Sequence, residues 1–398
     1  MQSVAEARGR ILAGLRPTAP EILALAEAAG RVLAQAVQAR LTQPPAAVSA
    51  MDGYAVRAAD AVPEALLRVI GAAPAGHPFA GIVGPGQALR IFTGAFVPEG
   101  ADAILLQEDA TAEGDTVLVR QAVQPGRWVR PAGLDFTAGE TLLAPGRRLT
   151  ARDIGLAAAA NHPWLAVHRR PRIAILATGD EIALPGDPLP AGGIVSSNAH
   201  ALAALVRAAG AEAVVLPIAP DNADAIAGLA QGARGCDMLV TTGGASVGEH
   251  DLVQQALGPQ GFALDFWKIA MRPGKPLIWG RLGETPMLGL PGNPVSALVC
   301  AVVFLLPAIA VLSGAPARET ATEAATAGAD LTANDQREDY LRCTLSEDGA
   351  VATPFPRQDS SMLKTLARAD ALLLRAPFAP ALAAGGPVRV IRLATLGI

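Results

Sequence analysis

Residues 237–251 read DMLVTTGGASVGEHD, and this stretch decides the fold. A short apolar run leads into two threonines and two glycines, and Ser246 is followed by Glu249, His250 and Asp251. The pattern predicts a buried strand that ends in a glycine-rich loop, with a helix beginning near Asp251. Ligands of open α/β sheets bind at the carboxyl ends of the strands, where backbone N–H groups face an anion. The stretch therefore predicts an anion-binding loop.

The segments on either side alternate between strand and helix character. Such alternation is typical of a doubly wound, mainly parallel α/β sheet. We expect strands in RIAILATGD (172–180), AVVLPI (213–218), DMLVTT (237–242) and ALDFWKI (263–269) and around Leu277 and Leu288, and helices at 198–209, after Asp221, after Asp251 and at 298–312.

The rest of the chain has a different texture. Residues 49–148 contain short apolar runs separated by Gly and Pro, which predicts a mostly β inserted domain. Residues 5–39, with a break at 17–20, and 150–160 have helical character, and we expect these two pieces to pack together. The expected domains are a helical linking domain (1–44 and 140–170), the β insertion (45–139), the α/β domain (171–314) and a C-terminal, β-barrel-like domain (315–398).

The composition excludes several classes of protein. At 398 residues the chain is longer than a single hydrophobic core usually accommodates, so we expect several domains. With 32 Lys and Arg against 36 Asp and Glu, the net charge of −4 gives no general attraction to nucleic acid or to a membrane surface. The run at 298–312 is shorter than the roughly 20 residues of a membrane span, so we expect a buried core helix.

The cysteines and histidines give no support for a disulfide framework or a zinc site. Cys236, Cys300 and Cys343 lie far apart in the sequence, and the five histidines do not form a metal-binding motif. The amino terminus lacks the apolar core of a signal peptide. We therefore expect a cytoplasmic protein.

Three loops are candidates for binding an anion: TTGGAS (241–246), MRPGKP (271–276) and LPGNPVS (290–296). Glycines allow close approach of the backbone, hydroxyls add donors, and Arg272 and Lys275 add positive charge. Each loop taken alone is equally typical of a plain turn between a strand and a helix. If all three follow strands of one sheet, however, they converge on one rim.

Acidic residues accompany these loops. ATGDE (177–181) ends the first strand, and Asp221, Asp237, Glu249 and Asp251 lie near other strand ends. Carboxylates beside a phosphate-binding loop are suited to Mg²⁺. For any one of them, simple exposure to solvent is the competing explanation, and a solvent-facing loop is the more common place for a histidine such as His250.

Six motifs taken together resemble one family. SAMDGYA (49–55), FTGAFVPEGADAI (92–104), ATGDE, TTGGASVGEHD, MRPGKP and LPGNPVS occur in the order found in the molybdopterin molybdotransferases of MoeA type, which include the gephyrin E domain. The resemblance covers about residues 49–296. It implies a homodimer of four-domain subunits that uses adenylylated molybdopterin, molybdate and Mg²⁺ and releases the molybdenum cofactor and AMP. Transient contact with other cofactor-biosynthesis proteins is also expected.

The resemblance also implies roles for individual residues, in a cleft between the α/β domain of one subunit and the β insertion of the other. The insertion contributes Asp52 and Thr93. In the α/β domain the expected groups are the Mg²⁺-binding or orienting acids Glu181, Asp221 and Asp251, the phosphate-binding residues Thr242, Gly243, Gly244 and Ser246, the cations Lys268, Arg272 and Lys275, and the wall residues Pro291 and Pro294.

The C-terminal domain departs from the family pattern. Members commonly carry a glycine-rich stretch before a Ser-Met pair, whereas residues 358–362 read QDSSM. Ser361 and Met362 keep the pair, but the missing glycines change what the backbone of this loop can adopt. By resemblance, Ser361 and Arg342 are expected to contact molybdate.

Two other functions remain open from the sequence. A molybdopterin adenylyltransferase could use the same α/β domain, although such an enzyme needs little more than that domain. A scaffold or binding protein could keep the fold without turnover, although it has no physical need for Asp52, Asp251 or Lys275.

Overall fold

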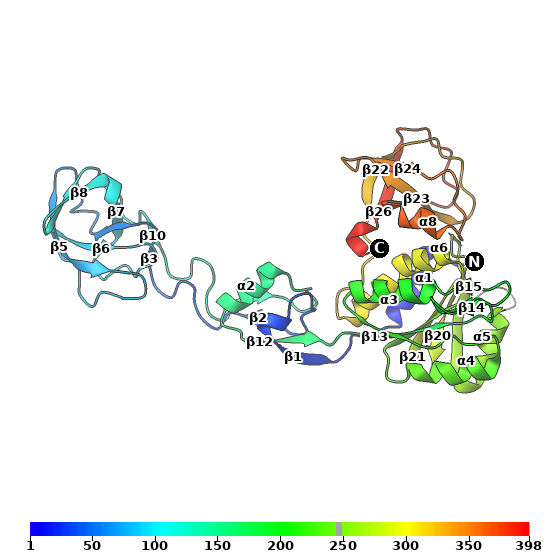
Figure 1. Cartoon of the computed structure of the whole chain (residues 1–398). Helices are drawn as coiled ribbons and strands as arrows, with labels where there is room; N and C mark the ends of the chain where they lie inside the picture. The colour runs from blue at the N-terminus through cyan, green and yellow to red at the C-terminus, as the bar shows by residue number, and fades with distance from the viewer. Residues whose placement is uncertain (244–248, 398) are drawn as a thin grey trace.

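The structure, a computed structural model, describes residues 1–243 and 249–397. The chain is elongated, with the β insertion at one end and the α/β and C-terminal domains together at the other (Figure 1). A small linking domain lies between them. The insertion therefore lies far from the α/β domain of its own chain.

The central sheet of the α/β domain has the order β16-β13-β17-β21-β20-β18. Strands β16, β13, β17 and β21 are parallel, β20 is antiparallel to β21, and β18 is antiparallel to β20. The bounds are β13 Arg172–Ala177, β16 Glu212–Val215, β17 Met238–Thr242, β18 Phe262–Lys268, β20 Pro276–Leu282 and β21 Thr285–Leu290. All six expected strands are confirmed.

Helices cover both faces of this sheet, as a doubly wound fold requires. One core joins the sheet to α3 and to the long apolar helix, and a second core joins the opposite face to α4 and α5 (Figure 1). The bounds are α3 Asn198–Ala208, α4 Ala223–Ala230, α5 Glu249–Leu257, α6 Pro294–Cys300, the π-helical turn η5 Ala301–Leu305 and α7 Leu306–Leu312.

In the described residues one helical run, Pro294–Leu312, is long and apolar enough to cross a membrane by length and composition. However, 83% of this run is buried inside the protein. It is the core helix expected from the sequence.

The linking domain corrects the expectation of helix over residues 21–39. This segment forms β1 (Pro20–Ala24) and the short turn η1 (Leu25–Glu27), and β1 pairs with β12 (Trp164–His168). Further along, β2 (Val37–Gln38) pairs with β11 (Thr141–Leu143). Pairing with strands more than 100 residues away overrides the helical propensity of an Ala- and Leu-rich segment.

The expected packing of the two helical pieces is confirmed for one half of residues 5–39. The segment after Pro20 shares a core with α2 (Ala151–Ala159) and β12. Helix α1 (Val4–Ala13), in contrast, packs through Val4, Ala7 and Ile11 into the core of the α/β domain. The apolar face of α1 matches the α/β core rather than the linking domain.

The insertion is a six-stranded sheet of order β7-β4-β6-β5-β9-β8 with small cores on both faces. A two-stranded ribbon of β3 and β10 leads into it. The bounds are β3 Val48–Ser49, β4 Gly53–Val56, β5 Leu66–Ala73, β6 Gln87–Ile91, β7 Ala103–Leu106, η2 Gln107–Asp109, β8 Ala110–Glu113, β9 Thr116–Val119 and β10 Val129–Arg130.

The C-terminal domain is a closed five-stranded barrel, as predicted. The ring runs β23-β24-β22-β26-β25 and closes by pairing of β25 with β23. A short strand of the α/β domain, β19 (Met271–Arg272), pairs with β23 from outside the ring. The bounds are β22 Glu323–Ala327, β23 Glu338–Leu345, β24 Val351–Pro354, α8 Leu363–Ala367, β25 Ala371–Arg375 and β26 Pro387–Arg392.

The remaining short elements are β14 (Ile182–Ala183), which pairs in parallel with β15 (Ile194–Val195), and three 3₁₀ turns. These turns are η3 Gln231–Ala233, η4 Gly258–Gln260 and η6 Ala394–Leu396. The β14–β15 pair lies beyond the carboxyl end of β13.

The core helix offers a test of the fold. Phe304 in η5 is fully buried, so Phe304→Ala should lower the free energy of unfolding by about 3–5 kcal/mol through lost burial and the cavity that remains. Phe378→Ala is the control, because this side chain is 75% exposed, and it should change stability by less than about 0.5 kcal/mol. Urea denaturation measures both. Equal effects of the two changes would contradict the packing described.

Candidate active site

A cavity of about 650 Å³ opens at the carboxyl ends of β13, β17 and β21. Thr178, Gly243 and Pro291 follow these three strands directly, and all three line it. The N–H of Thr178 donates to the carbonyl of Thr242 at 3.1 Å, which holds two of the strand ends together. Two of the three predicted loops therefore converge on one rim, and the third contributes Pro276.

Asn198 joins three parts of this rim. Its Nδ2 donates to Thr242 Oγ1 at 2.8 Å and to the carbonyl of Gly292 at 2.7 Å. The side chain thus connects the first residue of α3 with β17 and with the LPGNPVS loop. Asn198 was not predicted as a site residue from the sequence, although its place at the start of a predicted helix after a strand was a usable signal.

Gly243 occupies a position that requires glycine. Its φ is +89°, in the left-handed region, and a Cβ there would lie 2.4 Å from the carbonyl oxygen of Thr178. The close approach brings the chain after β17 against the end of β13. Glycine at this position therefore lets the ends of β13 and β17 lie together beside the cavity.

The predicted acidic residues do not all lie at the cavity. Glu181 lines the cavity. Asp180 and Asp221 lie next to each other: the N–H of Asp221 donates to Asp180 Oδ1 at 2.9 Å, and the N–H of Asp180 donates to Asp221 Oδ2 at 3.4 Å. Asp221 does not itself line the cavity.

Asp237, which the sequence placed among the acids near the anion-binding loops, lies away from the cavity. It precedes β17 and so lies at the amino end of the sheet, opposite the cavity. Its carboxylate accepts two hydrogen bonds from Arg169, at 2.8 and 2.6 Å, and one from the N–H of Arg172 at 2.7 Å. This contact holds the entry to β13 and β17 and has no link to the cavity.

The three predicted cations do not line the cavity in this chain. Lys275 is exposed and directly precedes the lining residue Pro276. Lys268 lies opposite Pro276 in the β18–β20 register, with its Nζ 3.8 Å from the ring centre of Trp267. Arg272 is turned toward the C-terminal barrel, where it pairs with Asp339.

The barrel supplies one wall of the cavity through the 358–362 loop. Ser361 lines the cavity, and its contact with molybdate stays a prediction. Ser360 bonds the LPGNPVS loop: Asn293 Nδ2 donates to Ser360 Oγ at 3.0 Å, and the N–H of Val295 donates to the carbonyl of Ser360 at 3.1 Å. Asp359 accepts from the N–H of Ser361 at 2.8 Å and from its hydroxyl at 2.6 Å. Side-chain hydrogen bonds thus fix the loop that lacks glycines.

Arg342 holds the 358–362 loop through hydrogen bonds. It is 1% exposed, and it donates from Nε to Gln358 Oε1 at 3.1 Å and from Nη1 to the carbonyl of Asp359 at 2.8 Å. It does not line the cavity. In this chain its contacts are to the loop that carries Ser361.

Asp52 directly precedes β4 and Thr93 closely follows β6, so both belong to the insertion. The insertion lies at the other end of the molecule from the α/β domain (Figure 1). Asp52 Oδ1 accepts both the N–H and the hydroxyl of Thr93, each at 2.8 Å. These hydrogen bonds, together with the charge of Arg90, lower the pKa of Asp52 below its ordinary value. The two residues form a hydrogen-bonded pair, but this chain does not bring them to its own cavity. Their place on the insertion side of a shared cleft stays a prediction.

Some predicted site residues lie outside the described part of the chain. Gly244 and Ser246 belong to residues 244–248, and the side chain of Asp251, at the start of α5, is not described either. Among the described residues no group of three His, Cys, Asp or Glu side chains could hold a metal ion.

Another cavity, of about 600 Å³, lies between α1 and the barrel. Its charged groups include the ion pair of Arg8 with Glu319, and Tyr340 donates to Glu338 at 2.5 Å. None of the predicted site residues lines it. We therefore place the candidate active site at the strand ends.

Comparison with known proteins agrees with this architecture. Residues 2–161 match the MoeA N-terminal region (domain I and II), residues 174–311 match a probable molybdopterin binding domain, and residues 324–393 match the MoeA C-terminal region (domain IV). The molybdopterin molybdenumtransferase 2 of Mycobacterium tuberculosis (strain H37Rv) is 38% identical over 384 residues, covering 94% of this chain and 95% of that protein. The chain belongs to the MoeA family. The resemblance noted from the sequence is confirmed.

Two further MoeA-family relatives support the assignment. The molybdopterin molybdenumtransferase of Nostoc sp. is 40% identical over 303 residues, which cover 74% of this chain and 70% of that protein. The crystal structure of the molybdopterin biosynthesis MoeA protein from Pyrococcus horikoshii superimposes with a TM-score of 0.85 at 28% identity and covers 98% of both chains. The multidomain fold is thus that of the family.

The geometry at Gly243 generates a prediction. Gly243→Ala should lower the free energy of unfolding by at least about 1–2 kcal/mol, because alanine is strained at this φ and its Cβ would clash with Thr178. Gly228→Ala, inside α4 where nothing lies within 4 Å of a new Cβ, is the control and should stabilise by about 0.5–1 kcal/mol. Thermal unfolding distinguishes the two signs. A neutral Gly243→Ala would contradict the close approach of β13 and β17.

The Asp52–Thr93 pair generates a second prediction. Thr93→Ala removes the hydroxyl donor while keeping the N–H donor, so the pKa of Asp52 should rise toward its ordinary value. Carboxyl-carbon NMR titration measures the shift. Thr116→Ala, which removes a hydroxyl that bonds only the carbonyl of Glu113 among the described residues, should leave the pKa of Asp52 unchanged. An unchanged pKa in Thr93→Ala would refute the assigned cause.

Proposed function

We propose that this chain transfers molybdenum to molybdopterin, with molybdate as the metal source. The observation that carries the proposal is the cavity at the ends of β13, β17 and β21, which joins the probable molybdopterin binding domain to a loop of the MoeA C-terminal region. The relatives that cover nearly the whole chain are named molybdopterin molybdenumtransferases. The chain keeps the insertion and barrel that an adenylyltransferase would not need.

We further propose that the substrate is adenylylated molybdopterin and that AMP is released. The rim offers the backbone at Gly243 to phosphate oxygens, with Lys275 next to the cavity. The hydroxyls of Thr242 and Ser361 border the same space, where they donate to the carbonyl of Pro291 and to Asp359. Hydrolysis of a phosphate linkage depends mainly on positioning and charge neutralisation. Molybdate, a tetrahedral dianion, is recognised by the same kinds of donor.

A divalent cation fits the oxygen ligands at one side of the cavity. Mg²⁺ is typically held by one or two carboxylates together with water and substrate phosphate oxygens, so a cluster of three acids is not required. Glu181 would hold it, with Asp221 and Asp251 as the further acidic candidates. When bound, the ion would neutralise charge on the phosphate oxygens.

The proposed site is completed by a second copy of the chain. Asp52 and Thr93 lie at the far end of the molecule from the cavity, so the insertion can approach a cavity only in another subunit (Figure 1). The Asp52 carboxylate, kept charged by Thr93 and Arg90, would then face the Glu181 side of the partner. We therefore propose a homodimer in which each site is shared.

We also propose a cytoplasmic location and transient contacts with other proteins. The three cysteines are free and buried, which fits the cytoplasm. Transient contact with other proteins of cofactor biosynthesis would deliver the adenylylated substrate. A non-catalytic scaffold is the competing function, and retention of Asp52, Glu181 and Lys275 speaks against it.

The function is tested by mixing two inactive variants. Wild-type protein supplied with adenylylated molybdopterin, Mg²⁺ and molybdate should release AMP, whereas Asp52→Asn and Glu181→Gln should each be inactive. Mixed after dissociation, the two variants should recover about a quarter of wild-type activity, because half of the dimers then contain one intact shared site.

The outcomes separate the claims. Wild-type dimer that releases no AMP above background would rule out the enzymatic function and leave the scaffold. Two inactive variants that stay inactive on mixing, although subunit exchange is shown by differently tagged chains, would rule out the shared site.

A further inference from the structure

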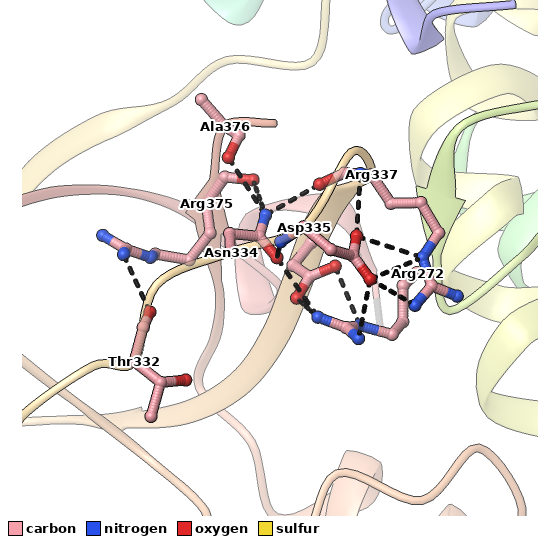
Figure 2. Close-up of polar contacts among 8 residues, drawn as sticks. Arg272, Thr332, Asn334, Asp335, Arg337, Arg375 and Ala376 are labelled. Atoms are coloured by element: carbon pink, nitrogen blue, oxygen red, sulfur yellow. Dashed lines mark hydrogen bonds and ion pairs between the residues drawn. The ribbon is translucent and has the colours of Figure 1, made fainter. Parts of the chain in front are cut away.

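Arg272 lies at the junction of the α/β domain and the C-terminal barrel (Figure 2). Its Nε donates to Asp339 Oδ1 at 2.9 Å, and its Nη2 bonds the other oxygen of the same carboxylate. Nη2 also donates to Asn334 Oδ1 at 3.2 Å, and Nη1 lies 3.5 Å from Asp335 Oδ2. The guanidinium is thus held by three residues of the barrel domain.

The acceptor side of this contact is fixed within the barrel domain itself. Asn334 Nδ2 donates to the carbonyls of Arg337, Arg375 and Ala376, at 2.7, 3.2 and 3.0 Å (Figure 2). Asp339 is 4% exposed, and a buried carboxylate is costly without a cation. The two-point geometry with an arginine is the strong form of such a pair. The barrel domain therefore holds the acceptor groups for Arg272 in place through its own contacts.

The charges around Arg272 are already balanced. Arg272 and Arg337 face Asp335 and Asp339, and the hydrogen bonds from Arg337 lower the pKa of Asp335 to about 2. Asp335 is therefore charged at neutral pH. Two positive and two negative groups leave no surplus positive charge for molybdate, in contrast to the exposed Lys275, which makes no ion pair with any described residue.

The backbone of the MRPGKP loop follows the Arg272 contact. Strand β19 pairs in parallel with β23, with Arg272 opposite Asp339, and the N–H of Glu338 donates to the carbonyl of Ala270 at 2.9 Å. On the other side, Gly274 packs against α6, where a Cβ would lie 2.4 Å from Cys300 Sγ. Three residues separate Arg272 from Pro276, which lines the cavity. The barrel contact therefore anchors the start of the loop that carries Lys275, and the carbonyl of Lys275 accepts a hydrogen bond from the N–H of Ile269 at 3.3 Å.

We propose that Arg272 is a positioning residue, whose pairing with Asp339 of the barrel holds the MRPGKP loop so that Lys275 is presented at the cavity rim. This replaces the expectation that Arg272 itself faces phosphate or molybdate. The proposal rests on the function proposed above and takes Lys275, which lies next to the cavity, as the cation that binds molybdate.

The test is a pair of variants and their combination. Asp339→Asn, at a residue that does not line the cavity, should raise the KM for molybdate about tenfold and change kcat by less than about twofold, because it misplaces a binding group without removing one. Arg272→Gln should do the same, and Arg272→Gln/Asp339→Asn should be no worse than either single change, because all three break one contact. Arg392→Gln, which breaks a barrel ion pair with Glu323 away from the loop, is the matched control and should keep the wild-type KM.

A structural measurement accompanies the kinetics. In Asp339→Asn, amides of residues 269–275 should exchange hydrogen about tenfold faster than in wild type, whereas Arg392→Gln should match wild type. Thermal unfolding of each variant establishes that the protein is folded.

Two results would overturn the proposal. A wild-type KM in Asp339→Asn beside a raised KM in Arg272→Gln would make Arg272 a direct ligand. Unchanged exchange of the loop in Asp339→Asn would show that the pair does not hold it. If wild-type protein releases no AMP, the proposed function fails by itself, and hydrogen exchange still decides whether Arg272 positions the loop.

Discussion

The parallel pairing of β13, β17 and β21 is the constraint on which the candidate site depends. Because parallel strands end at the same edge of a sheet, Thr178, Gly243 and Pro291 meet there although they are far apart in the sequence. The strand ends approach so closely that Gly243 has no room for a side chain. Asn198 then bonds the edge into one unit. The position of the cavity is therefore set by the backbone of the three strands, and the Asn198 side chain reinforces it.

The barrel is a second support for the same cavity. Strand β23 carries Asp339, which holds the MRPGKP loop through Arg272, and Arg342, which holds the loop containing Ser361. Both loops reach the rim, one at Pro276 and the other at Ser361. A closed ring of strands resists deformation. The C-terminal domain thus holds two loops that reach the cavity rim.

The sequence predicted local features well and long-range contacts poorly. The strands of the α/β domain and the rim loops were found because apolar runs and Gly-Pro turns mark them. Residues 21–39 were wrongly expected to be helical, because their strand partner β12 lies more than 100 residues away. Arg272 was expected to face the substrate by resemblance, but its pairing with Asp339 across two domains leaves no mark in the local sequence.

The proposed shared site needs a second subunit, because Asp52 and Thr93 lie apart from the cavity of their own chain. A crystal structure of the protein with AMP and molybdate bound tests this most directly. We expect the phosphate at Thr242 and Gly243 of one subunit, with molybdate near Lys275. Arg272 should still pair with Asp339, and Asp52 of the second subunit should face the ligands. Both ligands bound in the cavity, with the insertion of every neighbouring subunit turned away from it, would contradict the shared site.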